Sequence, residues 1–129
     1  MRLNADTNIL VRVLVDDDPV QSAMARAALA GHEVVITLPT LCELVWVLRT
    51  VYRRPVTEVA ATLRALMENA ATDRTAAEAG LRMLDAGGDF ADGVIAFEGQ
   101  RLGAEVFVSF DKRAVKLLEA AGEKAELLG

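Results

Sequence analysis

The chain has 129 residues and a hydrophobic content of 53%, which predicts one globular domain over residues 1–129. The single cysteine, Cys42, excludes an internal disulfide and a cysteine-built zinc site, so any metal ion would need oxygen ligands. The formal net charge of −5, from 14 Lys+Arg against 19 Asp+Glu, by itself disfavours a nucleic-acid partner.

The hydropathy pattern alternates short β-rich runs with helical stretches. In chain order it predicts a strand over 2–5, helices over 7–15 and 19–30, a strand over 34–37, helices over 39–53 and 56–69, a very short strand, helices over 75–86 and 90–102, a strand over 105–109, a helix over 112–121 and an edge strand over 124–128. Asp18-Pro19 is a cap followed by proline at the first helical position, and Pro55 stops the third helix. Strands separated by helices require right-handed crossovers, so the fold class is α/β with a parallel sheet covered on both faces.

Four acidic residues, Asp6, Glu43, Asp92 and Asp111, stand in apolar segments next to a predicted strand end or helix start. Asp6 and Asp111 directly follow predicted strands, and Glu43 and Asp92 lie in the first turns of helices that begin at the same edge. Because ligands of parallel sheets bind beyond the carboxyl ends of the strands, all four can point into one crevice. A lone carboxylate is costly in apolar surroundings, so four of them indicate a bound divalent cation.

Oxygen ligands favour Mg²⁺ or Mn²⁺. A pair of such ions ~3.5–4 Å apart can stabilise the attacking and leaving oxygens of a phosphodiester and lower the pKa of a bound water. Hydrolysis then needs no histidine, and the only one, His32, lies in a predicted surface loop. Setting the four acids aside changes the net charge from −5 to −1, so charge alone leaves the partner class open.

Each acid also has a structural interpretation. Asp6 and Asp111 can cap the helices that follow them, and Asp92 can be a first-turn acid favoured by the helix dipole. Glu43 fits such a role least, because it is surrounded by apolar residues in a helix for which we predict no polar face. The convergence of all four acids favours the metal site.

The acids belong to four blocks: Asp6-Thr7-Asn8, Glu43-Leu44, the segment 89–96, and Ser109-Phe110-Asp111. Their order and spacing resemble the four signature blocks of the PIN domain, most closely those of VapC-type toxins of bacterial and archaeal toxin–antitoxin pairs. The resemblance covers essentially the whole chain. It implies a PIN-like three-layer α/β/α fold around a mostly parallel sheet of four to five strands. It also implies a Mg²⁺- or Mn²⁺-dependent endoribonuclease whose dimer is held inactive by a VapB-type antitoxin.

Carried over residue by residue, the resemblance makes Asp6, Glu43, Asp92 and Asp111 the catalytic metal ligands. Asp89 matches an additional acid that only part of the family has. Gly93 follows Asp92 where alanine is more usual, which lowers helix propensity by up to ~1 kcal/mol but keeps the site roomy.

Auxiliary roles follow for the neighbours of these acids. Thr7 and Asn8 can cap a helix or support the metal ligands, and the Ser109 hydroxyl can bind a ligand carboxylate or a water, or be an ordinary strand-end serine. Three cations beside Asp111 are possible RNA-binding residues: Lys112, Arg113 and Lys116.

Other motifs have mainly structural interpretations. Asp16-Asp17-Asp18 is predicted to be a solvated cap before Pro19, with a second metal site as the alternative. The cations Arg49, Arg53 and Arg54 complement a helix C-terminus, with RNA contact as the alternative. Trp46 is predicted to pack in the core, with a dimer face as the alternative.

We therefore predict a cytoplasmic endoribonuclease toxin that is a homodimer and has no membrane partner, since no apolar stretch approaches the ~20 residues of a span. The alternative is a non-toxic or catalytically silent PIN-fold module that binds RNA or protein. A phosphoacceptor signalling domain would need paired acids after the first strand and a lysine after a late one. Here Asp6 is followed by Thr7-Asn8, and the late strand ends in an acid.

Overall fold

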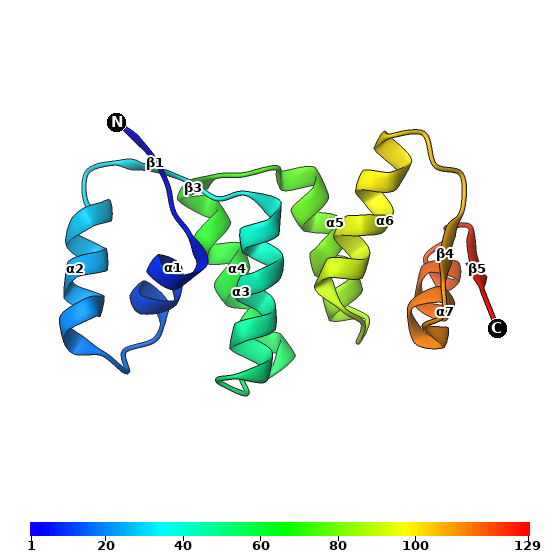
Figure 1. Ribbon diagram of the computed structural model, residues 1–129, viewed down its shortest axis with the longest axis horizontal. Helices are drawn as coiled ribbons and strands as arrows, with labels where there is room; N and C mark the ends of the chain where they lie inside the picture. The colour runs from blue at the N-terminus through cyan, green and yellow to red at the C-terminus, as the bar shows by residue number, and fades with distance from the viewer. The chain divides into compact units, whose positions relative to one another are not determined.

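The computed structural model describes residues 1–129 as seven helices and five short strands (Figure 1). In chain order these are β1 (Arg2–Asn4), α1 (Thr7–Leu14), α2 (Pro19–Leu29), β2 (Glu33–Val35), α3 (Leu38–Thr50), α4 (Val56–Glu68), β3 (Ala70–Ala71), α5 (Arg74–Asp85), α6 (Phe90–Arg101), β4 (Phe107–Ser109), α7 (Lys112–Ala120) and β5 (Ala125–Leu127). The chain divides into two compact units, residues 1–73 (unit 1) and residues 74–129 (unit 2). None of the helices has the length and apolar content that crossing a membrane requires.

Unit 1 is built on a parallel sheet in the order β1-β2-β3. Residues 2–4 pair in register with residues 33–35, so β1 and β2 end at the same edge, where α1 and α3 begin. Helix α1 packs against α2 and α3, and α3 packs against α4. The core side chains of these helices are almost inaccessible to solvent: Leu10, Leu41, Leu44, Val59 and Leu63.

The first two helices begin at acidic N-caps. The Ile9 N–H donates to Asp6 Oδ1 at 3.0 Å, and the Gln21 N–H donates to Asp18 Oδ1 at 3.1 Å. Pro19 occupies the first position of α2, where a backbone donor would lack a partner. The acid run before Pro19 therefore caps a helix, as the sequence predicts.

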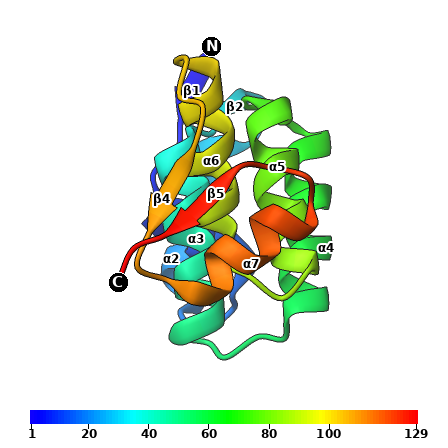
Figure 2. The same cartoon turned by 90° about the vertical axis from the view of Figure 1, so that its right-hand side faces the viewer.

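Unit 2 combines the helical pair α5–α6 with a two-stranded parallel sheet, β4-β5, and α7 (Figure 2). Helix α7 contacts both strands. Phe107 and Ala125, which are register partners, pack with Leu117 against a buried cluster of Met83, Ala96 and Leu118. One face of the small sheet is thereby covered by apolar side chains from α5, α6 and α7.

Two glycines let α5 and α6 approach closely. A Cβ atom added at Gly93 would lie 2.5 Å from the Ala79 carbonyl oxygen, and one added at Gly80 would lie 2.6 Å from the Phe90 ring. Phe90 is fully buried in this contact. The reason for glycine after Asp92 is thus helix packing, not the open site that the sequence analysis suggested.

The predicted α/β class with parallel strands is confirmed, and every predicted helix and strand is present to within about three residues. Strands β1, β2 and β3 form the parallel sheet of unit 1, and β4 and β5 form that of unit 2.

Two predictions about α3 were wrong. Trp46 is 60% exposed instead of packed in the core, and Glu43 is exposed on a helix that does have a solvent face. The buried stripe of α3 consists of Leu41, Leu44, Val45 and Leu48, which follows the helical period and leaves both residues outside it.

Candidate active site

Asp6 lies just beyond the end of β1 and caps α1. Its Oδ1 accepts the Ile9 N–H, which leaves Oδ2 available for another partner. Thr7 is only 7% exposed and begins the helix, whereas Asn8 is exposed on its first turn. Asp6 is therefore the cap of this helix, and capping occupies one of its two oxygens.

Glu43 lies in the second turn of α3, which follows β2. Its side chain is exposed, and α3 packs against α1, the helix that Asp6 caps. Because β1 and β2 are parallel and in register, Asp6 and the start of α3 lie at the same edge of the sheet. Unit 1 thus contributes two of the predicted ligands from one sheet edge.

Asp89 and Asp92 mark the first turn of α6. The Ala91 N–H donates to Asp89 Oδ1 at 2.9 Å, so Asp89 is the N-cap. Asp92 is half-buried, and its pKa is raised by this burial and, to a lesser degree, by the negative charges of Asp89 and Asp111. Asp89 and Asp111 are thus close enough to Asp92 to disfavour its ionisation.

Asp111 follows β4 and caps α7. Its Oδ1 accepts the N–H groups of Arg113 at 2.9 Å and Ala114 at 3.1 Å. The Asp111 N–H in turn donates to Ser109 Oγ at 2.9 Å. The predicted auxiliary residue Ser109 therefore contacts the backbone of Asp111 and helps to fix where its carboxylate lies.

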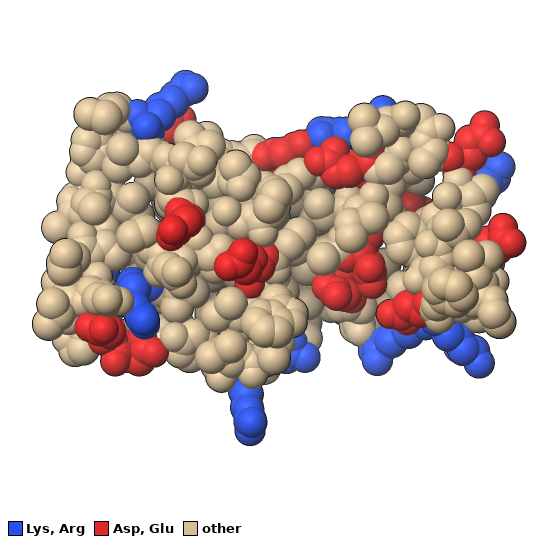
Figure 3. Space-filling model, in the orientation of Figure 1, with Lys and Arg blue, Asp and Glu red and all other residues tan.

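Cations surround the start of α7. Lys112, Arg113 and Lys116 are all exposed, and blue Lys and Arg atoms project below the part of unit 2 where α7 lies (Figure 3). The Arg113 guanidinium reaches the loop before Asp89, where a Cβ atom added at Gly87 would lie 2.9 Å from Nη2. The three predicted RNA-binding residues thus lie beside the acids of unit 2.

The pair Gly87-Gly88 was not among the predicted site residues, although Gly-Gly is a recognisable turn signal. Gly87 has a φ of +93°, and a Cβ atom added at Gly88 would lie 2.8 Å from Leu117 Cδ1. The pair lets the loop that carries Asp89 pass close to α7. It therefore contributes to the arrangement of the acidic residues in unit 2.

The predicted ligands are distributed over both units. Asp6 and Glu43 belong to unit 1, and Asp92 and Asp111 belong to unit 2, with Asp89 beside them. No group of three or more Asp, Glu, His or Cys side chains has a geometry that could hold a metal ion. The joining of all four ligands in one site stays a prediction.

The chemistry of the residues nevertheless suits a hard divalent cation. All five acids offer carboxylate oxygens, the ligands that Mg²⁺ and Mn²⁺ prefer. In unit 2 the burial of Asp92 and the neighbouring carboxylates concentrate negative charge that a cation would neutralise. His32 is exposed in the turn before β2, as predicted, and lies in neither acidic group.

A pocket of about 200 Å³ in unit 2 contains none of the predicted site residues. It is bordered by the second half of α6 and by β4, with Gln100, Phe107 and Glu123 among its residues. Outside this pocket, Asp6, Glu43, Asp89 and Asp111 are exposed and Asp92 is half-buried.

A comparison with protein-family models matches residues 5–120 to the PIN domain. No curated protein and no solved structure matches the chain. The family match extends over both units and includes all five acids described above. Because the match spans most of its length, the chain belongs to the PIN domain family.

Proposed function

We propose that the protein is a Mg²⁺- or Mn²⁺-dependent endoribonuclease that acts as the toxin of a toxin–antitoxin pair. Family membership supports the coarser part of this proposal, because PIN domains have a nuclease-type fold and generally depend on divalent metal ions. The observation that carries it is the acidic group of unit 2. Asp89 and Asp111 cap two helices that begin close together, and the half-buried Asp92 feels the charge of both.

Asp6, Glu43, Asp92 and Asp111 would hold the cation or cations, with Asp89 beside them. When bound, such an ion supplies Lewis-acid stabilisation of charge on the scissile phosphate and lowers the pKa of water. The chain's own contribution is orientation. The backbone N–H groups at the starts of α1 and α7 hold one oxygen of Asp6 and of Asp111, so their other oxygens have limited freedom.

The proposed partners are an RNA substrate, a second copy of the chain and a VapB-type antitoxin. Their support is the similarity of the four sequence blocks to VapC-type toxins, together with the exposed cations beside Asp111. A ribonuclease active in the cytoplasm would damage its own cell, so we expect a protein partner that inhibits it.

The metal-dependent activity is tested with purified protein and single-stranded RNA. We expect cleavage with Mg²⁺ or Mn²⁺ and none in EDTA, with activity restored when the metal ion is returned. The control variant Asp16→Asn should cleave RNA with the same metal dependence as wild type, because Asp16 is an exposed acid in the turn before α2 and belongs to neither acidic group. Cleavage that persists undiminished after chelation and dialysis would exclude the metal-dependent mechanism.

The toxin role is tested by expression without a partner. Wild-type protein should arrest growth, Asp92→Ala should relieve the arrest, and Asp16→Asn should arrest growth like the wild type. Arrest by Asp92→Ala at equal expression would contradict a catalytic origin of toxicity. Growth with all three proteins would favour the non-toxic PIN-fold module.

A further inference from the structure

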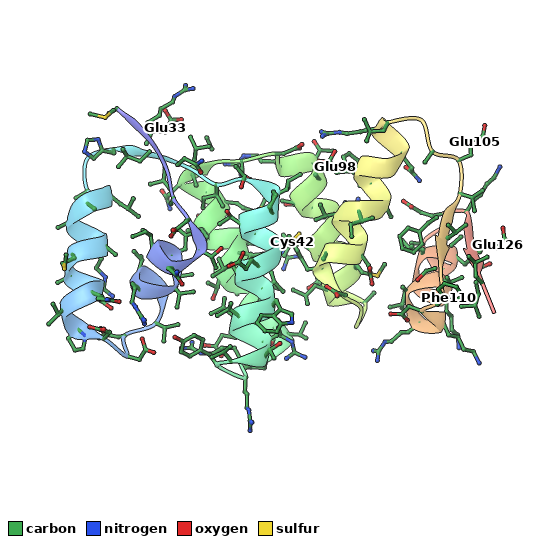
Figure 4. The ribbon with its side chains drawn as sticks, in the orientation of Figure 1. Glu33, Cys42, Glu98, Glu105, Phe110 and Glu126 are labelled. Atoms are coloured by element: carbon green, nitrogen blue, oxygen red, sulfur yellow. The ribbon has the colours of Figure 1, made fainter.

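Phe110 is the most exposed aromatic side chain on this surface and lies between two residues of the candidate site. It follows Ser109, the last residue of β4, and precedes Asp111, the N-cap of α7. Its side chain is 79% exposed, and Figure 4 labels it beside the end of β4 and the start of α7. Within unit 2 the ring takes no part in the buried cluster of Met83, Ala96 and Leu118, so packing of that unit does not explain it.

The alternation of β4 accounts for the direction of this ring. Phe107 packs against the apolar cluster that α7 covers, so Val108 is directed to the opposite face of the strand and is 56% exposed. Phe110 is two residues after Val108, so by the same alternation its side chain lies on the exposed face, just past the end of the strand. The chain therefore presents the ring outward, next to the residue that supplies a candidate metal ligand.

The charges near Phe110 favour a polyanion as its partner. Lys112, Arg113 and Lys116 follow it on α7, all exposed and none in an ion pair. By contrast, Arg12 and Arg54 of unit 1 are each bound to an acid, at 2.9 Å and 2.7 Å. The cations of α7 are thus available for phosphate groups, and the start of the helix adds the positive end of its dipole.

The strand beside β4 carries both signs of charge. Glu126 on β5 is the register partner of Val108 and is exposed, and the exposed Lys124 stands just before β5. The three cations of α7 are therefore the charges that attract a phosphate chain, and Phe110 lies one residue from Asp111, where that helix starts.

We propose that Phe110 is a stacking platform for an unpaired base of single-stranded RNA, next to the phosphate that is cleaved. This inference rests on the proposed ribonuclease function and adds a residue that positions its substrate. Proteins that bind single strands combine a positively charged path for the backbone with aromatic rings on which bases stack. Phe110 and the three cations of α7 form that combination within one unit, and a base held there would place its phosphate near Asp111.

The first experiment measures the affinity of a fluorescent single-stranded oligoribonucleotide, by anisotropy, in Ca²⁺ so that cleavage is suppressed. Phe110→Ala should weaken binding about 5- to 100-fold, the range typical of one stacked base. Phe110→Trp should restore or improve affinity, whereas Phe110→Leu, which is apolar but lacks a π face, should not. Leu102→Ala is the matched control, because Leu102 is 89% exposed at the end of α6 and outside the proposed site.

The second experiment replaces the bases of the oligonucleotide by abasic positions, one at a time. At one position the loss of the base should weaken binding to wild type, yet have little effect on Phe110→Ala, because both changes remove the same contact. In cleavage assays with Mg²⁺, Phe110→Ala should raise KM more than it lowers kcat. Thermal melts of all variants confirm that each protein is folded.

The proposal is overturned if Phe110→Ala binds RNA as tightly as Leu102→Ala does while wild type still cleaves RNA. In that case the ribonuclease function stands and only the stacking role fails. It is also overturned if Phe110→Ala changes the molecular mass in light scattering and leaves RNA affinity unaltered, since the ring would then belong to a protein interface. Wild-type protein that neither binds nor cleaves RNA would contradict both the function and the platform.

Discussion

A carboxylate that caps a helix through one oxygen can still bind another partner through its second oxygen. Asp6, Asp89 and Asp111 each accept backbone N–H groups through Oδ1. For Asp6 and Asp111 the sequence alone left two roles open, helix cap or metal ligand. The structure establishes the capping role, and because capping uses only one oxygen, it is compatible with the proposed ligand role.

The two roles of Asp6 can be separated by substitution. Asp6→Asn should abolish RNA cleavage, because it removes the charge of a proposed metal ligand. Asparagine is an N-cap about as good as aspartate, so the free energy of unfolding should change little. Asp6→Ala removes the cap as well, and should lower that free energy by about 0.5–2 kcal/mol. Urea denaturation of both variants in EDTA, beside cleavage assays, measures the two effects. A large loss of stability in Asp6→Asn would make the charge of Asp6 a structural requirement.

Asp92 should make stability depend on pH in the absence of metal. Burial and the charges of Asp89 and Asp111 raise its pKa in the folded protein above the ordinary value of 3.8. Protonation of Asp92 therefore favours the fold. This contribution is fully present below pH 3.8 and is lost as pH rises through the higher folded-state pKa.

Asp92→Asn stays neutral at every pH, so its stability relative to wild type should increase from about pH 3 to pH 7. Urea midpoints of both proteins across this range, in EDTA, measure the difference. Asp16→Asn serves as the control and should show no comparable trend. A free energy of unfolding of Asp92→Asn that falls relative to wild type as pH rises would contradict the assigned direction.

At the scale of elements, the contact between α5 and α6 positions Asp92, and glycines make it possible. Gly93→Ala would bring a methyl group within 2.5 Å of the Ala79 carbonyl oxygen and 2.8 Å of Met83 Cβ. We expect a loss of about 1–3 kcal/mol in the free energy of unfolding, the usual effect of overpacking. Cleavage activity should fall too, because α6 would have to shift.

Gly99→Ala is a control in the same helix. Its added Cβ would have Ala104 Cβ at 3.8 Å as its nearest neighbour, an ordinary contact. Because alanine has the higher helix propensity, Gly99→Ala should raise the free energy of unfolding by up to ~1 kcal/mol. Equal stability changes in the two variants, measured by urea denaturation, would show that packing at Gly93 is not the cause.

The sequence predicted most elements because their signals are local. The caps Asp6 and Asp18, Pro19 and Pro55 mark helix ends without reference to the rest of the chain. The exposure of Trp46 and Glu43 was missed because α3 is apolar nearly throughout, which hides which stripe is buried. The spacing of Leu41, Leu44, Val45 and Leu48 contains that information, although composition does not.

For the whole molecule, the proposed function requires that an acidic protein bind a polyanion. The net charge of −5 becomes −1 once Asp6, Glu43, Asp92 and Asp111 are set aside, so bound cations could make the site positive. Lys112→Ala and Arg113→Ala should each weaken RNA binding and reduce its logarithmic salt dependence by about 0.7. The measurement is RNA affinity across a salt series, with and without Ca²⁺.

Arg54→Ala is the matched control for this series, because Arg54 already pairs with Glu58 at 2.7 Å. It should leave the salt dependence unchanged. If neither Ca²⁺ nor the α7 substitutions alter the salt dependence of RNA binding, then Arg49 and Arg53 of unit 1 become the better candidates for phosphate contacts. The distribution of charge, unlike the total, could not be obtained from the sequence, because it depends on which residues meet in space.

The position of each acid relative to the strands and helices was predictable from local signals: Asp6 and Asp111 follow strands, and Asp92 lies in the first turn of a helix. What local patterns could not give is how strands far apart in the chain pair, and hence which acids become neighbours. Asp89, Asp92 and Asp111 form one electrostatic group although the last is 19 positions from the second. Whether Asp6 and Glu43 join these acids in one site stays a prediction.

Asp6 and Asp111 are helix caps as well as proposed metal ligands, and this combination affects what a single mutation of the gene can do. Aspartate codons become asparagine codons by a single G-to-A transition, and asparagine caps a helix about as well as aspartate does. One nucleotide change can therefore silence the proposed chemistry while the protein folds and keeps its binding surfaces. An Asp6→Asn or Asp111→Asn variant should therefore persist as a stable, folded and inactive protein.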